Sequence, residues 1–187
     1  MTERQAYIAF NLTERVGTAT LGKLIAEYGS AVAAWEHYPN KVARAGGEVD
    51  WEREEALAKK YGVTILTQAD FRYPVRLKES PGAPLVLYVK GEVMALSRPM
   101  VAMIGTRRAT AYGLGVARQM ASDLARAVWA VVSGLALGID AASHQGALDG
   151  KGVTVGVLGS GLDRFYPEEN RPLARTIIEN GGAVISE

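Results

Sequence analysis

Three glycine-rich segments carry residue types that suit the binding of phosphate groups. They are residues 105–113 (GTRRATAYG), 133–140 (SGLALGID) and 159–167 (GSGLDRFYP), hereafter the first, second and third segments. Glycine lets backbone N–H groups approach an anion closely, hydroxyls add neutral donors, and the planar guanidinium of arginine matches phosphate oxygens. Taken singly, each segment could instead be a tight turn that uses glycine only for its geometry. Three such segments, one with paired arginines, favour anion binding.

Basic charge is concentrated around the first segment. The 187-residue chain has a net charge of +1, from 21 Lys and Arg against 20 Asp and Glu. Residues 98–126 contain five arginines and one carboxylate, so this stretch alone has a net charge of +4. Such a local excess is what phosphate binding requires. The charged residues of the stretch are Arg98, Arg107, Arg108, Arg118, Arg126 and Asp123.

The composition excludes several kinds of chemistry. Cysteine is absent, which excludes disulfides, thiolate nucleophiles and cysteine-ligated metals. The two histidines, His37 and His144, cannot form a histidine-rich metal site, so we expect no metal and no cofactor. No apolar run approaches the ~20 residues that span a bilayer, and the first residues do not form a secretory signal. We therefore expect a cytoplasmic protein without a membrane partner.

Familiar catalytic motifs are missing as well. The chain has no P-loop and no GxSxG nucleophile elbow, and the GxGxxG dinucleotide fingerprint does not open the first strand–helix turn. Asp140 and His144 are four residues apart and could share a helix face. They are either a catalytic pair or a helix-capping carboxylate beside a half-buried imidazole, and we favour the second interpretation. We expect no catalytic residue and no enzymatic activity.

The order of apolar runs predicts two domains. Residues 1–62 show short helical patterns separated by small-residue turns, which indicates a small all-helical domain. Over residues 63–187 strands and helices alternate, which predicts a Rossmann-like α/β domain with a mostly parallel sheet and helices on both faces. Because the chain stops just after a core strand, we expect this domain to continue beyond Glu187. The expected strands are 63–67, 85–91, 100–105, 130–134, 153–161 and 183–187, and the expected helices are 113–127, 139–150 and 168–182.

In their order and spacing, these motifs resemble those of a known family. GTRRATAYG, SGLALGIDAASHQGAL, GVLGSGLDRFYPEENRPLARTI and GGAVISE, preceded by FRYPVRLKESPGAPLVLYVKG, are similar to the corresponding motifs of the DNA-processing protein A (DprA/Smf) family. The resemblance is strong over about residues 70–187. It is weak over residues 1–65, where many members carry a small helical domain of the sterile-alpha-motif type.

The resemblance implies an extended Rossmann domain that binds single-stranded DNA. It also implies homodimers of the full-length protein, loading of RecA recombinase during natural transformation, and no enzymatic activity. The family's GSR arginine falls on Arg107, with Thr106 in place of the serine. Val153 stands where many members have Lys or Arg, and Lys151 is the candidate substitute. The family's downstream FP.RNR motif is absent from this sequence.

The candidate DNA-binding residues come from the three segments and from the resemblance. In the third segment, we expect one of Phe165 and Tyr166 to stack on bases and the other to anchor the loop. Trp35, Trp51 and Trp129 are expected in the core. The whole candidate set is Gly105, Thr106, Arg107, Arg108, Thr110, Ser133, Gly134, Lys151, Gly159, Ser160, Gly161, Arg164, Phe165, Tyr166 and Asn170.

An enzyme is the alternative function. Lysine-decarboxylase-like phosphoribohydrolases share the Rossmann-like frame and carry a PGGxGT loop followed by a catalytic Glu. This chain has no PGG, and Glu187 stands alone after a predicted strand. The sequence therefore favours single-stranded DNA binding over hydrolysis of a nucleotide.

Overall fold

Caps decide where the first four helices begin and end. Thr2 and Gln5 form a capping box at the first helix, and Ser30 and Asp50 accept backbone N–H bonds at the third and fourth. Gly29 ends the second helix with φ of 87°, in the left-handed region that favours glycine. In the computed structural model, which describes residues 1–187, these helices are α1 (Glu3–Leu12), α2 (Thr18–Tyr28), α3 (Ala31–His37) and α4 (Trp51–Lys60).

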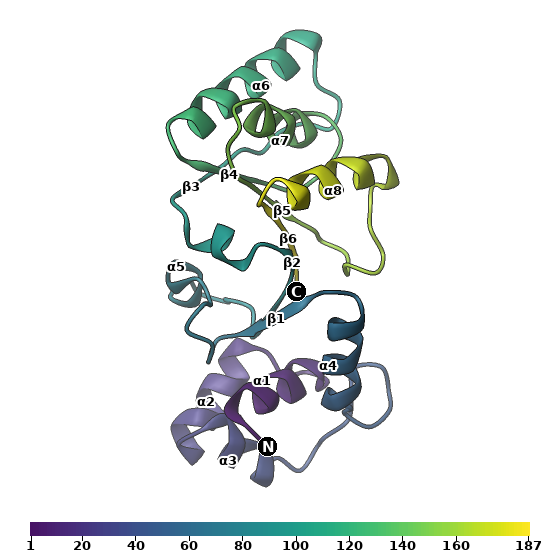
Figure 1. Cartoon of the computed structure of the whole chain (residues 1–187). Coiled ribbons are helices and arrows are strands. Elements are labelled where there is room, and N and C mark those ends of the chain that lie inside the picture. Colours follow the sequence, from purple (N-terminus) through teal and green to yellow (C-terminus); the bar gives the residue numbers. More distant parts are fainter. The chain divides into compact units, whose positions relative to one another are not determined.

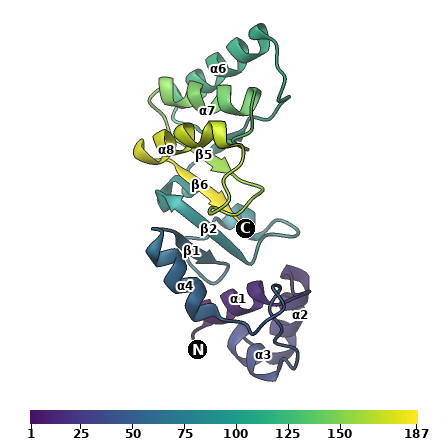
Figure 2. The same ribbon diagram turned by 90° about the vertical axis from the view of Figure 1, so that its right-hand side faces the viewer.

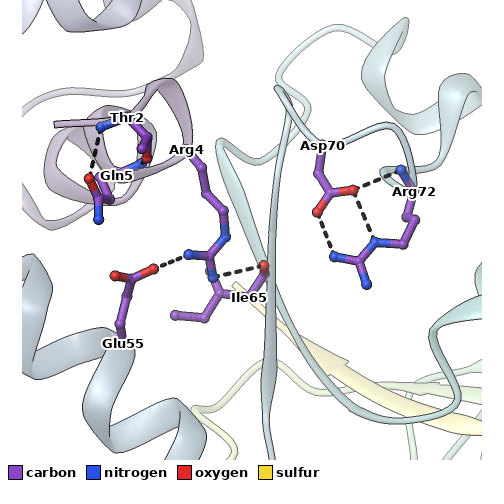
Figure 3. Close-up of polar contacts among 7 residues, drawn as sticks. All are labelled: Thr2, Arg4, Gln5, Glu55, Ile65, Asp70 and Arg72. Carbon is purple, nitrogen blue, oxygen red and sulfur yellow. Dashed lines mark hydrogen bonds and ion pairs between the residues drawn. The ribbon is translucent and has the colours of Figure 1, made fainter.

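The chain divides into two compact units, Met1–Leu87 and Tyr88–Glu187. The first unit contains the four helices, β1 (Thr64–Thr67), α5 (Val75–Lys78) and the start of β2 (Val86–Gly91). Strand β1 contacts both α1 and α4, and the guanidinium of Arg4 pairs with Glu55 of α4 and donates to the Ile65 carbonyl (Figure 3). These contacts tie β1 to the helices. A domain boundary after residue 62 stays a prediction.

The second unit is a mostly parallel α/β structure, as the alternating pattern predicts. The strands of the whole sheet follow the order β1-β2-β6-β5-β4-β3, with β3 to β6 parallel and β2 antiparallel to β6. In register, Val131 lies beside Thr154, and Val155 lies beside Ala183. The elements of this unit are η1 (Val93–Ser97), β3 (Met100–Ala102), α6 (Ala111–Arg126), β4 (Ala130–Ser133), α7 (Ile139–Asp149), β5 (Thr154–Val157), η2 (Glu168–Asn170), α8 (Arg171–Glu179) and β6 (Ala183–Ser186).

Helices α6, α7 and α8 follow one another along one face of this sheet (Figures 1 and 2). Each strand from β3 to β6 is added on the same side of the one before, so every right-handed crossover passes over the same face. Val131 packs against Ala121 of α6 and Ala147 of α7, and Val184 packs against Ile177 of α8. The three α-helices share one face, and the short η1 packs against β5 and β6.

Tryptophan burial differs from the expectation at one position. Trp35 and Trp51 are half-buried, but Trp129 is 43 % exposed. Trp129 follows Val128, whose φ is 67°, in the short link between α6 and β4, so it lies at the amino end of β4 and outside the core. None of the helices is long and apolar enough to cross a membrane.

Candidate nucleic-acid interface

Parallel strand direction brings the three segments to one edge of the sheet. They follow β3, β4 and β5, and the carboxyl ends of parallel strands meet at the same edge. The first and second segments touch through their backbones. The Ile139 N–H donates to the Thr106 carbonyl over 3.2 Å, and a Cβ atom on Gly138 would collide with that carbonyl and with the Arg107 backbone. Only glycine fits at Gly138, where φ is 82°.

A buried amide ties the third segment to the second. The Asn170 side chain is 8 % exposed, and its Nδ2 donates to the Leu135 carbonyl at 2.8 Å and the Ala136 carbonyl at 3.0 Å. The Ser186 hydroxyl donates to the Ser160 carbonyl at 2.9 Å. Asn170, a candidate ligand-binding residue, therefore uses its amide N–H groups inside the protein.

The first segment presents two unpaired guanidinium groups. Arg107 and Arg108 are exposed and form no ion pair, unlike most arginines around them. The Thr106 hydroxyl accepts from the Arg108 N–H at 3.1 Å, and the Thr110 hydroxyl caps α6 by accepting from the Gly113 N–H at 3.1 Å. Both arginines precede the amino terminus of the 16-residue α6, where the helix dipole adds positive potential. This arrangement can hold an anion.

The remaining arginines of residues 98–126 are less suited to this role. Arg118 bonds to Asp149, and Arg126 lies 3.8 Å from Asp123. The hydrogen bond from Arg118 holds the pKa of Asp149 below its usual value. Arg98 precedes β3 and so lies at the other end of that strand. Of the five arginines in residues 98–126, only Arg107 and Arg108 are therefore unpaired cations at this edge of the sheet.

The polar atoms of the second segment are bound internally. The Ser133 side chain is buried, and its hydroxyl donates to the Met103 carbonyl at 2.6 Å. The Gly134 N–H donates to Asp140 Oδ2 at 3.1 Å, so it is not directed at an outside anion. Asp140 is itself 5 % exposed, and its Oδ1 has no hydrogen-bond partner. Ser133 and Gly134 therefore support the edge of the sheet from within.

The third segment separates its two aromatic rings. Phe165 is half-buried against a core cluster that includes Leu158 and Ile177. Tyr166 is 69 % exposed, so its ring is the one open to stacking. Around them Gly159, Gly161 and Arg164 are exposed, with Arg164 Nε 3.9 Å from Asp163, and the buried Ser160 hydroxyl has no hydrogen-bond partner.

Lys151 is the candidate residue that the structure does not bring to this edge. It follows α7 and precedes β5, so it lies at the amino end of a strand whose carboxyl end carries the third segment. Its side chain is exposed, and its φ of 56° marks a tight turn.

Asp140 and His144 form part of the core. His144 is fully buried, and its Nδ1 lies 2.7 Å from the Thr154 hydroxyl, which donates its only hydrogen to the Val131 carbonyl at 2.7 Å. The imidazole Nδ1 must therefore carry the proton and donate. Burial lowers the pKa of His144 to about 4, against an opposing effect of the Asp140 charge. The ring, expected to be half-buried, is a neutral core group out of reach of a substrate. No three His, Asp or Glu side chains gather as a metal site.

Tyr112 is a further candidate that the sequence-based set does not contain. It lies within the first segment, in the first turn of α6, and is 83 % exposed. An aromatic ring in the same glycine-rich segment as two arginines is the signal that could have indicated it.

Comparison with known proteins now decides the family. The family model of DNA recombination-mediator protein A matches residues 64–187, and the DprA-like N-terminal HHH domain model matches residues 3–58. The chain belongs to the DNA recombination-mediator protein A family. The resemblance to DprA/Smf proteins seen in the motifs is thereby confirmed.

Relatives of this family include curated proteins and solved structures. DNA processing protein DprA of Bacillus subtilis is 38 % identical over 120 residues, and Protein Smf of Synechocystis is 30 % identical over 204 residues. The alignments cover 64 % and 100 % of this chain but only 40 % and 51 % of those relatives. The X-ray structure of DprA from Streptococcus pneumoniae matches with a TM-score of 0.67 at 25 % identity, covering 100 % of this chain and 67 % of that one.

A second solved structure concerns DNA directly. It is described as showing the single-stranded DNA binding mode of DNA processing protein A from Helicobacter pylori. That protein matches with a TM-score of 0.55 at 31 % identity, over 66 % of this chain and 54 % of its own.

Proposed function

We propose that this chain binds single-stranded DNA at the sheet edge formed by the first and third segments. The observation that carries the proposal is the pair of exposed, unpaired guanidinium groups of Arg107 and Arg108. Their backbone is held in place by the contact with Gly138. Unpaired guanidinium groups can bind phosphate oxygens without first breaking an internal ion pair.

Contacts to the strand are divided between phosphates and bases. Arg107 is the main phosphate anchor, and the exposed rings of Tyr166 and Tyr112 offer stacking surfaces. Stacking and backbone contacts are tolerant of sequence, so binding is expected with little base preference. Ser133, Gly134, Phe165 and Asn170 keep the frame in shape. The proposed contact set is Gly105, Thr106, Arg107, Arg108, Thr110, Tyr112, Gly159, Ser160, Gly161, Arg164 and Tyr166.

The wider role follows from the family. The Helicobacter pylori relative is described as binding single-stranded DNA, and the matched family model is that of a recombination mediator. We therefore assign to this chain a part in DNA processing during recombination in the cytoplasm. We propose that this part includes homodimer formation and loading of RecA on the bound strand during natural transformation.

The proposed binding involves no turnover. His144 is fully buried and unprotonated at neutral pH, so its ring is not accessible to a substrate at the three segments. The competing function, nucleotide hydrolysis by a phosphoribohydrolase, predicts release of free base from a nucleoside monophosphate. Incubation with each of the four monophosphates, followed by chromatography, should show no free base.

A salt titration tests the proposal. Affinity for a labelled oligothymidine is measured at several salt concentrations, with duplex DNA and mononucleotides as competitors. If about three phosphates are neutralised, the slope of log affinity against log salt should be near −2, from roughly 0.7 per contact. Duplex should compete poorly because its bases are not free to stack. An affinity that is independent of salt, or a preference for mononucleotides over the oligomer, would contradict the proposal.

A further inference from the structure

An almost fully exposed aromatic ring lies in the first unit, away from the three segments in sequence. Phe71 is 92 % exposed, more than any other large apolar residue of the chain. It follows β1, and Val75, four residues on, is 65 % exposed. A single exposed apolar side chain is ordinary, so the case for a ligand depends on what surrounds this ring.

The turn that carries Phe71 is fixed by its neighbours. The Asp70 carboxylate binds Arg72 through both oxygens, at 3.1 Å to Nε and 2.8 Å to Nη2, and also accepts from the Arg72 N–H at 2.9 Å (Figure 3). Tyr73 is 2 % exposed and donates from its hydroxyl to the Pro84 carbonyl at 2.7 Å. The Arg72 guanidinium lies 5.7 Å from the centre of the Phe71 ring. The ring is thus presented on a rigid support.

The surroundings of the ring are basic. Residues 71–78 carry three cations, Arg72, Arg76 and Lys78, and no carboxylate, and Asp70 and Glu79 lie on either side of this stretch. Arg72 is neutralised by Asp70, but Arg76 and Lys78 are exposed and form no ion pair. An exposed ring beside two free cations suits a single-stranded nucleic acid, whose bases stack and whose phosphates attract cations.

The nearby cleft of the first unit is less suited to a strand. It has a volume of about 470 Å³ and contains Arg4, Lys59 and Arg72 among its walls. Two of these three cations are already bound to carboxylates, Arg4 to Glu55 and Arg72 to Asp70 (Figure 3). The outward ring and the free cations after it are therefore the better docking point.

We propose that Phe71, with Arg76 and Lys78, forms a second contact for single-stranded nucleic acid, in which Phe71 stacks on a base. This inference rests on the proposed function, since it assigns the same class of ligand to a separate contact within the first unit. Here the ring supplies base stacking, and the two cations supply phosphate contacts.

Binding of two probes separates these contributions. The full chain and its variants are titrated with a labelled oligothymidine and with an abasic strand of the same length. Phe71→Ala should lower affinity for oligothymidine about fivefold or more and change affinity for the abasic strand by less than about twofold, because only bases stack. Phe71→Trp should keep or raise the affinity. The double variant Arg76→Ala/Lys78→Ala should weaken both probes and reduce the salt slope by about 1.4, from roughly 0.7 per contact.

Tyr61→Ala is the matched control. Tyr61 is 57 % exposed and its ring contacts Lys60, but it follows α4, whose three basic residues are balanced by three glutamates, so its removal should leave both affinities unchanged. Thermal melting by circular dichroism checks that the variants fold. If Phe71→Ala binds oligothymidine as the unmodified chain does, or loses both probes equally, the ring is not a stacking surface and a protein partner becomes the better occupant. If the unmodified chain binds neither probe, the proposed function itself fails.

Discussion

The first and second segments have similar compositions but use their polar groups in different ways. Both follow parallel strands and both combine glycine with small polar residues. In the second, the Ser133 hydroxyl and the Gly134 N–H bind Met103 and Asp140 inside the protein. In the first, the guanidinium groups of Arg107 and Arg108 remain unpaired and exposed. A glycine-rich turn can therefore either bind an outside anion or hold a neighbouring turn in place, and we propose that the first segment does the former and the second does the latter.

The largest expected effect comes from the point where the two segments touch. Gly138→Ala should lower the free energy of unfolding by about 3 kcal/mol, because a side chain there meets the Thr106 carbonyl and the φ of 82° is strained for other residues. Urea denaturation measures the change. Gly115→Ala is the control, since Gly115 lies in α6 with open space around it and should gain about 0.5–1 kcal/mol from better helix propensity. Equal stabilities of the two variants would show that the segments do not depend on each other.

The fold was largely predictable from the sequence because apolar periodicity and glycine positions report local structure. The helix expected at 139–150 and the strand expected at 130–134 match α7 and β4 closely. Whether Ser133 faces a carbonyl or an anion depends on Met103, thirty residues away, and no local pattern reports that. Lys151 was included through family resemblance, although its place before β5 puts it at the opposite end of the strand. Tyr112 was missed because its exposure depends on how α6 packs.

A second expected effect concerns pH and tests the burial of His144, next to the second segment. His144 follows the second segment, and its pKa is lowered to about 4 in the folded chain, against about 6.5 when unfolded. The unfolded chain therefore takes up a proton first as pH falls. Stability should be complete above about pH 6.5 and should decrease by up to about 3 kcal/mol as pH approaches 4.

Urea denaturation at several pH values from 7 to 4 checks this window. Asp70 and Asp149, whose pKa values are lowered by Arg72 and Arg118, lose their contributions only below about pH 4, so they do not obscure it. The variant His144→Gln should show a flat profile over the same range, whatever its absolute stability. A flat profile for the unmodified chain would mean that His144 is not a buried neutral group.

The third expected effect concerns the exposed arginines of the first segment. Arg107→Ala should weaken binding to oligothymidine by about 2 kcal/mol, because one charge-assisted contact is lost. Arg118→Ala removes the same charge from α6, but Arg118 is held by Asp149, so affinity should change by less than about 0.5 kcal/mol. Fluorescence anisotropy at fixed salt compares the two. Equal losses would indicate that only the total charge of α6 and its surroundings matters.

The smallest expected effects come from two substitutions, one of a residue that supports the fold and one of a proposed DNA contact. Ser133→Ala removes a buried hydrogen bond to Met103 and should cost about 1 kcal/mol of unfolding free energy, with DNA affinity unchanged within about twofold. Thr106→Ala removes an exposed hydroxyl that accepts from the Arg108 N–H. Its cost in stability should be below about 0.5 kcal/mol, whereas affinity should fall a few-fold because the Arg108 backbone is less well held. Denaturation and anisotropy on both variants should therefore give opposite rankings. The same ranking from both measurements would mean that the two segments share one role, and the distinction between binding and supporting turns would have to be abandoned.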